Sequence, residues 1–354
     1  MHRQLVHLVW IASLLAGCSG GGSPTDGVPS ASAATVPPTE AVTSTTLSPT
    51  TTTTPVLPTS LAFNLPDGFM YPEGAAFDPT TGRVYVTSIQ SGAVAVAEPG
   101  SDTATVWLEA GSDGRDMSAL GIEFGGDRVW IVSNGLYEYR TDGTLIARHD
   151  PTGPTGGGLN DVTVTDDGVY VSDSSASLVW YLPLDASVET SLQPIDIGAV
   201  NAEAAQDAFN GIEALPDGTL VAGQYTGTQL FHIDPRVPSA VVIDLGDGYV
   251  TQQVAPTGSS RQVRYAGTDG MSLDGDVLWT TNTSGNAVDR VTLCPTYDCG
   301  TIVAGASDPL LSFPTDVQIA GDVVVVVNSQ FPGLIGALEP TLPFTIAAIP
   351  INTP

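Results

Sequence analysis

From residue 61 onward, hydrophobic and polar residues alternate in short stretches that are separated by turn-forming residues. A representative stretch is Asp167-Gly-Val-Tyr-Val-Ser-Asp173, in which a Gly-containing turn leads into an apolar strand that ends in small polar residues. Alternation with a period of two is typical of β-strands, because successive side chains point to opposite faces of a sheet. The pattern therefore predicts antiparallel strands joined by tight turns, with one turn of helix expected at 202–209.

The pattern contains a repeat unit that occurs six times. Each unit consists of two strands joined by a turn, often followed by a third strand. Successive copies begin 47, 40, 50, 59 and 46 residues apart, at Glu73, Leu120, Asn160, Asn210, Asp269 and Thr315. A period of ~40–50 residues of antiparallel strands is typical of β-propeller blades. A single four-stranded blade cannot bury both of its apolar faces, whereas blades stacked around a ring bury both. The sequence predicts an all-β fold, a six-bladed β-propeller of four-stranded antiparallel blades, over residues 61–354.

The composition agrees with many short strands and restricts the function. The 39 glycines and 27 prolines suit a chain of tight turns and do not suit long helices. The chain has 38 Asp and Glu against 10 Lys and Arg, a net charge of -28, and all of its basic residues are arginines. A surface this acidic repels phosphate backbones, so no nucleic acid is expected as a partner. We expect a monomer that binds a small-molecule substrate or ligand.

The first 60 residues differ in character from the repeats. Residues 1–17 combine a basic start with an apolar run at 5–15, which is typical of a secretory signal peptide and too short for a permanent membrane helix. Leu15-Ala-Gly-Cys18 resembles the lipobox of bacterial lipoproteins, and this resemblance implies a lipid anchor on Cys18. Residues 18–60 are rich in Gly, Ser, Thr and Pro and are predicted to form a disordered tether.

These features predict an exported protein that is lipid-anchored to a bacterial membrane and faces the outside; ordinary secretion with a free Cys18 is the alternative. The remaining cysteines fit an oxidising compartment, because Cys294 and Cys299 lie five residues apart across a turn that contains Pro295. Such a pair can reach the ~5.5 Å Cα separation of a disulfide. Two thiols alone would leave a metal site short of ligands. We therefore expect a disulfide between them.

The residue that begins the first strand of each repeat is expected to face the central channel, because propeller blades are related by rotation about that channel. Two of these residues are carboxylates, Glu73 and Asp269, and two are amides, Asn160 and Asn210. Asn and Asp also occur freely in turns, which is the alternative for any one of them alone. Together, their oxygens suit a hard divalent cation. Calcium, which takes about 6–8 oxygen ligands, is the first choice, with magnesium and zinc as alternatives.

Four short motifs occur in a fixed order at these positions: Tyr71-Pro72-Glu73-Gly74, Asn160-Asp161, Phe209-Asn210-Gly211 and Thr268-Asp269-Gly270-Met271. In this order they resemble the senescence marker protein/gluconolactonase family, over residues 66–330. The resemblance implies a six-bladed propeller with one metal ion in its channel. It also implies that Glu73, Asn210 and Asp269 hold the metal directly, and that Asn160 is a further ligand or a substrate contact.

The resemblance further implies hydrolysis of a lactone or a related ester. The metal would polarise the carbonyl oxygen and lower the pKa of a bound water, and Asp269 would accept the proton of the attacking water. One position departs from the family. Members that act on sugar lactones often have an arginine two residues before the third-blade Asn, where this chain has Gly158. The departure argues against a polyhydroxylated sugar lactone and leaves the substrate unassigned.

Two other functions are compatible with a propeller. One is a non-catalytic, metal-containing propeller that binds a ligand or an envelope protein. The other is a lyase resembling the streptogramin lyases, which would need a histidine in the channel. His149 and His232 are the histidines outside the signal segment, and neither lies at the phase of the repeat that faces the channel. The hydrolase is therefore the preferred interpretation.

Overall fold

The computed structural model describes residues 60–351 of the 354-residue chain, apart from short gaps at 116–117, 154–157, 202, 207, 225–226, 228, 247–248, 255–258, 265–267, 284 and 307. The chain divides into two units, Met1–Thr54 and Pro55–Pro354, and the described residues belong to the second. The predicted signal peptide 1–17, the lipidation site Cys18 and the tether up to residue 59 lie outside the described residues and stay predictions.

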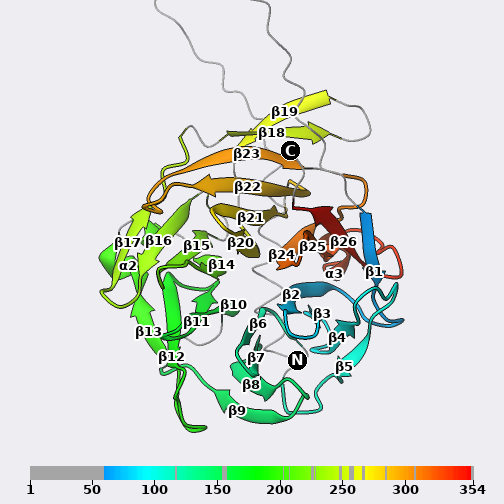
Figure 1. The fold of residues 1–354 in the computed structure, drawn as a ribbon, viewed down its shortest axis with the longest axis horizontal. Helices are drawn as coiled ribbons and strands as arrows, with labels where there is room; N and C mark the ends of the chain where they lie inside the picture. The colour runs from blue at the N-terminus through cyan, green and yellow to red at the C-terminus, as the bar shows by residue number, and fades with distance from the viewer. Residues whose placement is uncertain are drawn as a thin grey trace, which may run out of the picture. The chain divides into compact units, whose positions relative to one another are not determined.

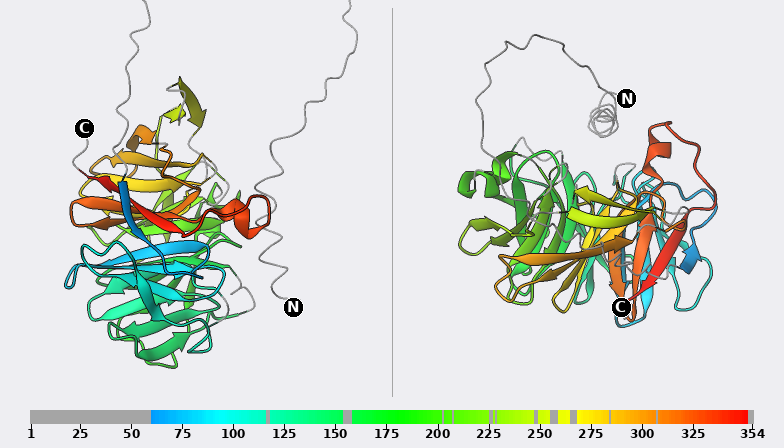
Figure 2. Two further views of the ribbon diagram at one scale, coloured as in Figure 1. Left: turned by 90° about the vertical axis from the view of Figure 1, so that its right-hand side faces the viewer. Right: turned by 90° about the horizontal axis from the view of Figure 1, so that it is seen from above.

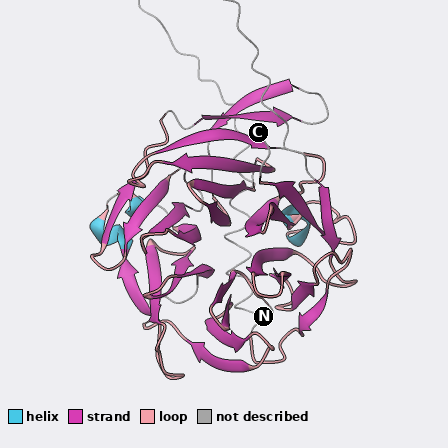
Figure 3. Cartoon of the chain, viewed as in Figure 1, coloured by secondary structure: helices cyan, strands magenta, loops and turns pink. Residues whose placement is uncertain are grey.

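The described strands form six four-stranded antiparallel sheets around a central axis (Figures 1 and 3). Each sheet is one blade, and β2, β6, β10, β14, β20 and β24 are the innermost strands. Blades 1 to 3 consist of β2 (Pro72–Asp78), β3 (Arg83–Ser88), β4 (Val94–Ala97) and β5 (Thr105–Leu108); β6 (Ile122–Gly125), β7 (Arg128–Val132), β8 (Leu136–Arg140) and β9 (Leu145–His149); and β10 (Leu159–Val164), β11 (Gly168–Asp173), β12 (Leu178–Pro183) and β13 (Gln193–Asp196). Blades 4 to 6 consist of β14 (Phe209–Ala214), β15 (Leu220–Gln224), β16 (Leu230–Asp234) and β17 (Ser239–Val242); β20 (Met271–Asp274), β21 (Val277–Asn282), β22 (Ala287–Leu293) and β23 (Gly300–Ala306); and β24 (Pro314–Ala320), β25 (Val323–Asn328), β26 (Thr345–Pro350) and β1 (Ser60–Asn64). The predicted six-bladed propeller is therefore confirmed.

Blade 6 takes strands from both ends of the described chain, and this closes the ring. β1 pairs antiparallel with β26, with Ser60 opposite Ala348 and Asn64 opposite Thr345. An open strand edge is a site for unwanted pairing, and here β1 covers the edge of β26. The repeat pattern does not indicate this closure, because β1 lies before the first copy of the repeat.

The six repeat starts all lie at or just before the beginning of an innermost strand, as predicted. The longest spacing, the 59 residues between Asn210 and Asp269, contains an additional hairpin of β18 (Tyr249–Val254) and β19 (Ser259–Arg264). Figure 1 shows β18 between β19 and β23, and β18 contacts β23. The hairpin is an insertion between blades 4 and 5 and does not form a further blade.

Apolar side chains fill the spaces between neighbouring blades. Tyr85 of blade 1 lies in one buried cluster with Val129 and Tyr139 of blade 2. Trp180 and Trp279 are among the largest fully buried side chains, which agrees with packing between strands and not with a carbohydrate-binding surface. Burying one large apolar side chain contributes roughly 1.5–3 kcal/mol, so these inter-blade contacts stabilise the ring.

Helix is sparse in the part of the chain that the structure describes. The turn of helix expected at 202–209 is a 3-10 helix, η2 (Ala204–Gln206), and the short α2 (Ile197–Val200) precedes it. The sequence did not predict α3 (Phe331–Leu334), which lies in the connection between β25 and β26 and projects from one face of the ring (Figure 2). Among the described helices, none combines the length and the apolar character needed to cross a membrane.

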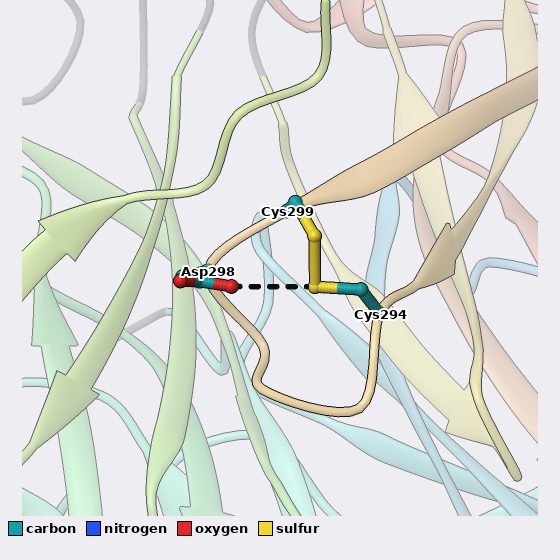
Figure 4. A group of neighbouring side chains, drawn as sticks. All are labelled: Cys294, Asp298 and Cys299. Carbon is teal, nitrogen blue, oxygen red and sulfur yellow. Dashed lines mark hydrogen bonds between the residues drawn. A yellow bond between two sulfur atoms is a disulfide. The ribbon is translucent and has the colours of Figure 1, made fainter.

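The predicted disulfide is present in the turn between β22 and β23. Cys294 and Cys299 are bonded to each other, with their Cα atoms 5.4 Å apart. Asp298 Oδ1 lies 3.3 Å from Cys294 Sγ (Figure 4), so these three side chains superficially form a metal-binding group. Because both sulfurs are bonded in the disulfide, neither is available as a thiolate ligand. The disulfide instead cross-links the two ends of the turn.

Candidate functional site

Four of the described innermost strands are irregular where they reach the channel. The strand register shifts between Pro72 and Ala75 in blade 1, and equivalent shifts occur at Leu159–Val162, Phe209–Ile212 and Pro314–Asp316. A β-bulge of this kind adds a residue to one strand and redirects its side chains. Glu73, Asn160, Asn210 and Thr315 all lie inside these bulges.

The predicted channel residues converge on one small cavity on the axis. Its lining includes all four predicted ligands, Glu73, Asn160, Asn210 and Asp269, together with Thr315. Leu120, the apolar member of the repeat set, is not part of the lining. The cavity volume is about 10 Å³, which is room for about one particle of the size of a water molecule. This space suits a single ion and is far too small for an organic substrate.

Asn210 presents a buried oxygen that has no partner of its own. Its side chain is 3% exposed, and its Oδ1 accepts no hydrogen bond. The same amide group hydrogen-bonds the Asp269 carboxylate, so its nitrogen is engaged while its oxygen is not. A buried acceptor without a donor costs about 1–3 kcal/mol. A cation in the cavity would remove this cost, and the donor set therefore fits a metal ion.

The two predicted carboxylate ligands crowd one another without a counter-charge. Burial, followed by repulsion from Asp269, Asp316 and Asp161, raises the pKa of Glu73 well above its usual range. Burial also raises the pKa of Asp269 to about 7, against the effect of a hydrogen bond from Thr283. The described lining of the cavity contains no basic side chain. A divalent cation between the carboxylates would replace this repulsion with attraction.

Two further carboxylates, Asp161 and Asp316, line the same cavity but also connect neighbouring blades. Asp161 of blade 3 accepts a hydrogen bond from the backbone N–H of Ile212 in blade 4, at 3.0 Å. Asp316 of blade 6 accepts one from the N–H of Ala75 in blade 1, at 2.6 Å. Each thus connects its blade to the next one around the ring. The sequence distinguishes these two residues, because Asp161 and Asp316 occupy the repeat position at which the other four repeats have glycine.

Glycine at that position permits close approach of the blades near the axis. A Cβ atom on Gly211 would lie 2.0 Å from the backbone oxygen of Asp269, and one on Gly270 would lie 1.8 Å from Asp316 Oδ1. Neither distance is tolerable for real atoms. The Gly that follows Asn210 and Asp269 in the sequence motifs is therefore a steric requirement of the ring.

Gly211→Ala is accordingly expected to lower the free energy of unfolding and to weaken cation uptake, because the new methyl group must displace the backbone of Asp269. Urea denaturation and calcium titration of the variant measure both effects. Ser239→Ala, at an exposed position on β17, serves as the control and should change neither. If Gly211→Ala binds calcium and unfolds like the parent protein, the tight approach of blades 4 and 5 is wrong.

Glu123 and Glu213 are partly buried acids on β6 and β14, further along the channel strands, and the sequence analysis did not single them out. Burial raises the pKa of Glu123 to about 8, and Asp161 adds to the effect. Burial, with repulsion from Glu123, Asp161 and Asp316, raises the pKa of Glu213 well above its usual range. The acidic character of the channel therefore extends beyond the predicted ligands.

Both candidate histidines lie away from the cavity. The ring nitrogen Nδ1 of His149, on β9, lies 2.7 Å from the carbonyl oxygen of Thr190. His232, on β16, places Nε2 2.8 Å from the hydroxyl of Thr219. Neither is part of the cavity lining. Both therefore occupy structural positions, as their phase in the repeat predicts.

The position at which sugar-lactone members of the resembled family carry an arginine has no space for a side chain. A Cβ atom on Gly158 would lie 2.4 Å from Asp173 Oδ1 and 2.4 Å from Ser175 Oγ. Asp173 is held there by hydrogen bonds from Trp180 and Ser175. The packing of blade 3 therefore requires glycine at position 158, where those family members have arginine.

Comparison with solved structures supports the fold. A gluconolactonase candidate matches with a TM-score of 0.55 and 16% identity, over 84% of this chain and 94% of its own. Virginiamycin B lyase from Staphylococcus aureus matches with a TM-score of 0.52 and 13% identity, over 83% and 100%. The PQQ-bound aldose sugar dehydrogenase from Streptomyces coelicolor matches with a TM-score of 0.52 and 15% identity, over 83% and 98%.

No protein-family profile and no curated protein sequence matches the chain. At the identities of the matched structures, the likeness concerns the fold alone. The same ring carries a lactonase candidate, a lyase and a dehydrogenase, so function has to be argued from the residues of the site.

Proposed function

We propose that this protein is a hydrolase of lactones or related esters that uses one divalent metal ion, calcium in the first place, in its channel. The observation that carries the proposal is the cavity itself. The carboxylates Glu73 and Asp269 and the residue Asn210, whose Oδ1 has no hydrogen-bond partner, line a space of the size of one ion. Hard oxygen donors of this kind are the ligands that calcium prefers, and magnesium or zinc are the alternatives.

The residues of the cavity divide into metal ligands and a base. Glu73, Asn210 and Asp269 would hold the ion, with Asn160 as a further ligand or a contact to the substrate. A divalent ion at such a site polarises an ester carbonyl and acidifies water. Asp269 would take the proton of the attacking water. A carboxylate that also holds a cation is a weaker base than a free one, so Asp269 would act on a water within hydrogen-bond reach.

The substrate class follows from what surrounds the cavity. The packing of Asp173 and Ser175 against Gly158 excludes the arginine that would contact a sugar lactone at that position. The proposal is therefore a lactone or ester without a polyhydroxylated sugar group.

A non-catalytic role has one observation in its favour. The cavity accommodates an ion and nothing larger, so the ion could act purely as a structural clamp between blades. The protein would then be a propeller that binds a ligand or an envelope protein on its surface.

Export and lipid anchoring through Cys18 are proposed on the sequence of residues 1–18. The disulfide between Cys294 and Cys299 supports this location, because disulfides persist in oxidising compartments outside the cytosol.

The test uses the purified chain, loaded with calcium, magnesium or zinc after removal of bound metal by a chelator. We expect about one equivalent of metal by elemental analysis, and hydrolysis of at least one member of a panel of lactones and aryl esters. Hydrolysis should stop in chelator and return with the metal. Metal-loaded protein that hydrolyses no panel member favours the structural role, and protein that takes up no metal contradicts the site.

A further inference from the structure

One hydroxyl group outside the predicted ligand set touches the carboxylate at the centre of the site. Thr283 follows β21 directly, at the start of the turn that leads to β22. Its Oγ1 lies 3.0 Å from Asp269 Oδ2. The same Oγ1 lies 2.7 Å from the backbone oxygen of Pro314 in blade 6.

The chemistry of these contacts sets their direction. A threonine hydroxyl carries one proton, and both of its neighbours, a carboxylate and a carbonyl oxygen, are acceptors. When Asp269 is ionised, as a metal ligand must be, the contact is attractive only if Thr283 donates to it. The single proton of Thr283 then serves the Asp269 carboxylate, and the Pro314 oxygen of blade 6 is a close neighbour of Oγ1 that competes for it.

The position of the Asp269 carboxylate in turn fixes the orientation of the Asn210 side-chain amide, which hydrogen-bonds it. Thr283 engages Oδ2, and the amide group of Asn210 donates to the same carboxylate. Because an amide that donates through its nitrogen directs its oxygen the other way, Asn210 Oδ1 is left without a hydrogen bond at the cavity. Thr283 thus lies at the outer end of a chain of contacts that orients two of the proposed metal ligands.

A second contact connects this turn to the third proposed ligand. Pro314, the alternative acceptor of the Thr283 hydroxyl, directly precedes Thr315. Thr315 Oγ1 donates to the backbone oxygen of Glu73 at 2.8 Å. The hydrogen bond of Thr315 therefore joins blades 6 and 1 beside the cavity, next to the point where the Thr283 turn of blade 5 meets Pro314.

We infer that Thr283 is a positioning residue, which turns the Asp269 carboxylate, and through it the Asn210 amide, so that their free oxygens face the ion. The inference rests on the proposed function for its metal-binding part. Partners that orient metal ligands commonly affect metal affinity by about 10–100-fold when they are removed.

The experiment compares three variants of the full chain with the parent. Thr283→Val removes the donor at nearly constant size, and Thr283→Ser keeps it. Thr281→Val is the matched control, because the Thr281 hydroxyl contacts the backbone oxygens of Gly270 and Thr315 but not Asp269. Calcium affinity is measured by titration calorimetry, and unfolding by urea in the presence of chelator.

We expect Thr283→Val to weaken calcium binding by about 10–100-fold and Thr283→Ser to restore it to within a few-fold of the parent. Thr281→Val should lower stability in chelator but leave calcium affinity near the parent value. A merely structural role for Thr283 would give the opposite pattern, with lost stability and unchanged affinity. Parent-like calcium affinity in Thr283→Val overturns the inference.

Crystal structures of the parent and of Thr283→Val without added metal separate this inference from the proposed function. We expect the Asp269 carboxylate to rotate in the variant. If it keeps its orientation, the inference is wrong even if metal binding is affected. If the parent protein takes up no calcium, the proposed function fails, while the comparison of the two carboxylate orientations still decides the role of Thr283.

Discussion

Asp269→Asn is expected to abolish hydrolysis and to weaken calcium binding by at least about 100-fold, as loss of a mere orienting partner already costs about 10–100-fold. The substitution removes a metal ligand and the proposed base at once, and loss of a general base alone lowers rates by about 10²–10⁴-fold. Glu73→Gln should lose calcium binding to a similar extent but retain the base. Titration calorimetry and ester hydrolysis measure the two effects.

The stability of these variants should change in opposite directions with and without metal. In chelator, both variants should be more stable than the parent, because each removes one of two buried carboxylates that repel one another. At calcium near 1,000 times the parent's Kd, the parent gains about 4 kcal/mol, or roughly 10 °C in unfolding temperature. The variants should gain almost none of this.

The control for both variants is Asp276→Asn, in the exposed turn between β20 and β21. It changes the net charge by the same amount as Asp269→Asn but lies outside the cavity lining. It should bind calcium like the parent. If Asp269→Asn and Glu73→Gln also bind calcium like the parent, the assignment of the site is wrong.

The metal-free protein should lose stability as the pH rises from about 4 to about 8. Glu123 carries this prediction, because burial raises its pKa to about 8, against a usual value near 4.3 in an unfolded chain. Between these two values the folded state retains a proton that the unfolded state has released. The stabilisation is therefore complete below pH ~4 and is lost as the pH rises through 8.

The size of the effect is on the order of 3 kcal/mol for Glu123, since the full pKa difference would give about 5 kcal/mol and part of the side chain remains exposed. Urea denaturation in chelator at pH 5, 6, 7 and 8 measures it. Glu123→Gln should show a flatter profile, and Glu109→Gln, at an exposed position, should follow the parent. A parent stability that rises over this range would contradict the prediction.

The periodic part of the molecule could be predicted from the sequence because rotation about the channel makes equivalent repeat positions neighbours in space. Glu73 and Asp269 are 196 residues apart in the chain, yet equal phase in the repeat was sufficient to place them in one cavity. Likewise, the five-residue spacing of Cys294 and Cys299 was sufficient for the disulfide.

The contacts that could not be predicted from the sequence join residues at different positions of the repeat unit. Thr283 reaches Asp269 from a turn, and Asp161 reaches the backbone of Ile212 across a blade boundary. Neither contact follows from the alignment of repeats, because each joins positions that the alignment keeps apart. The β18–β19 hairpin and α3 were missed for a related reason, since they are insertions that have no counterpart in other blades.

The pairing of β1 with β26 has a consequence for biosynthesis. Ribosomes make β1 before any other described strand of the ring, and its partner β26 is the last of these strands to be made. The nascent chain therefore carries β1 without its partner strand until about 280 residues of further sequence have been produced. A chaperone that shields this early segment, or slow elongation through the final blade, would decide how much of the newly made polypeptide reaches the closed state.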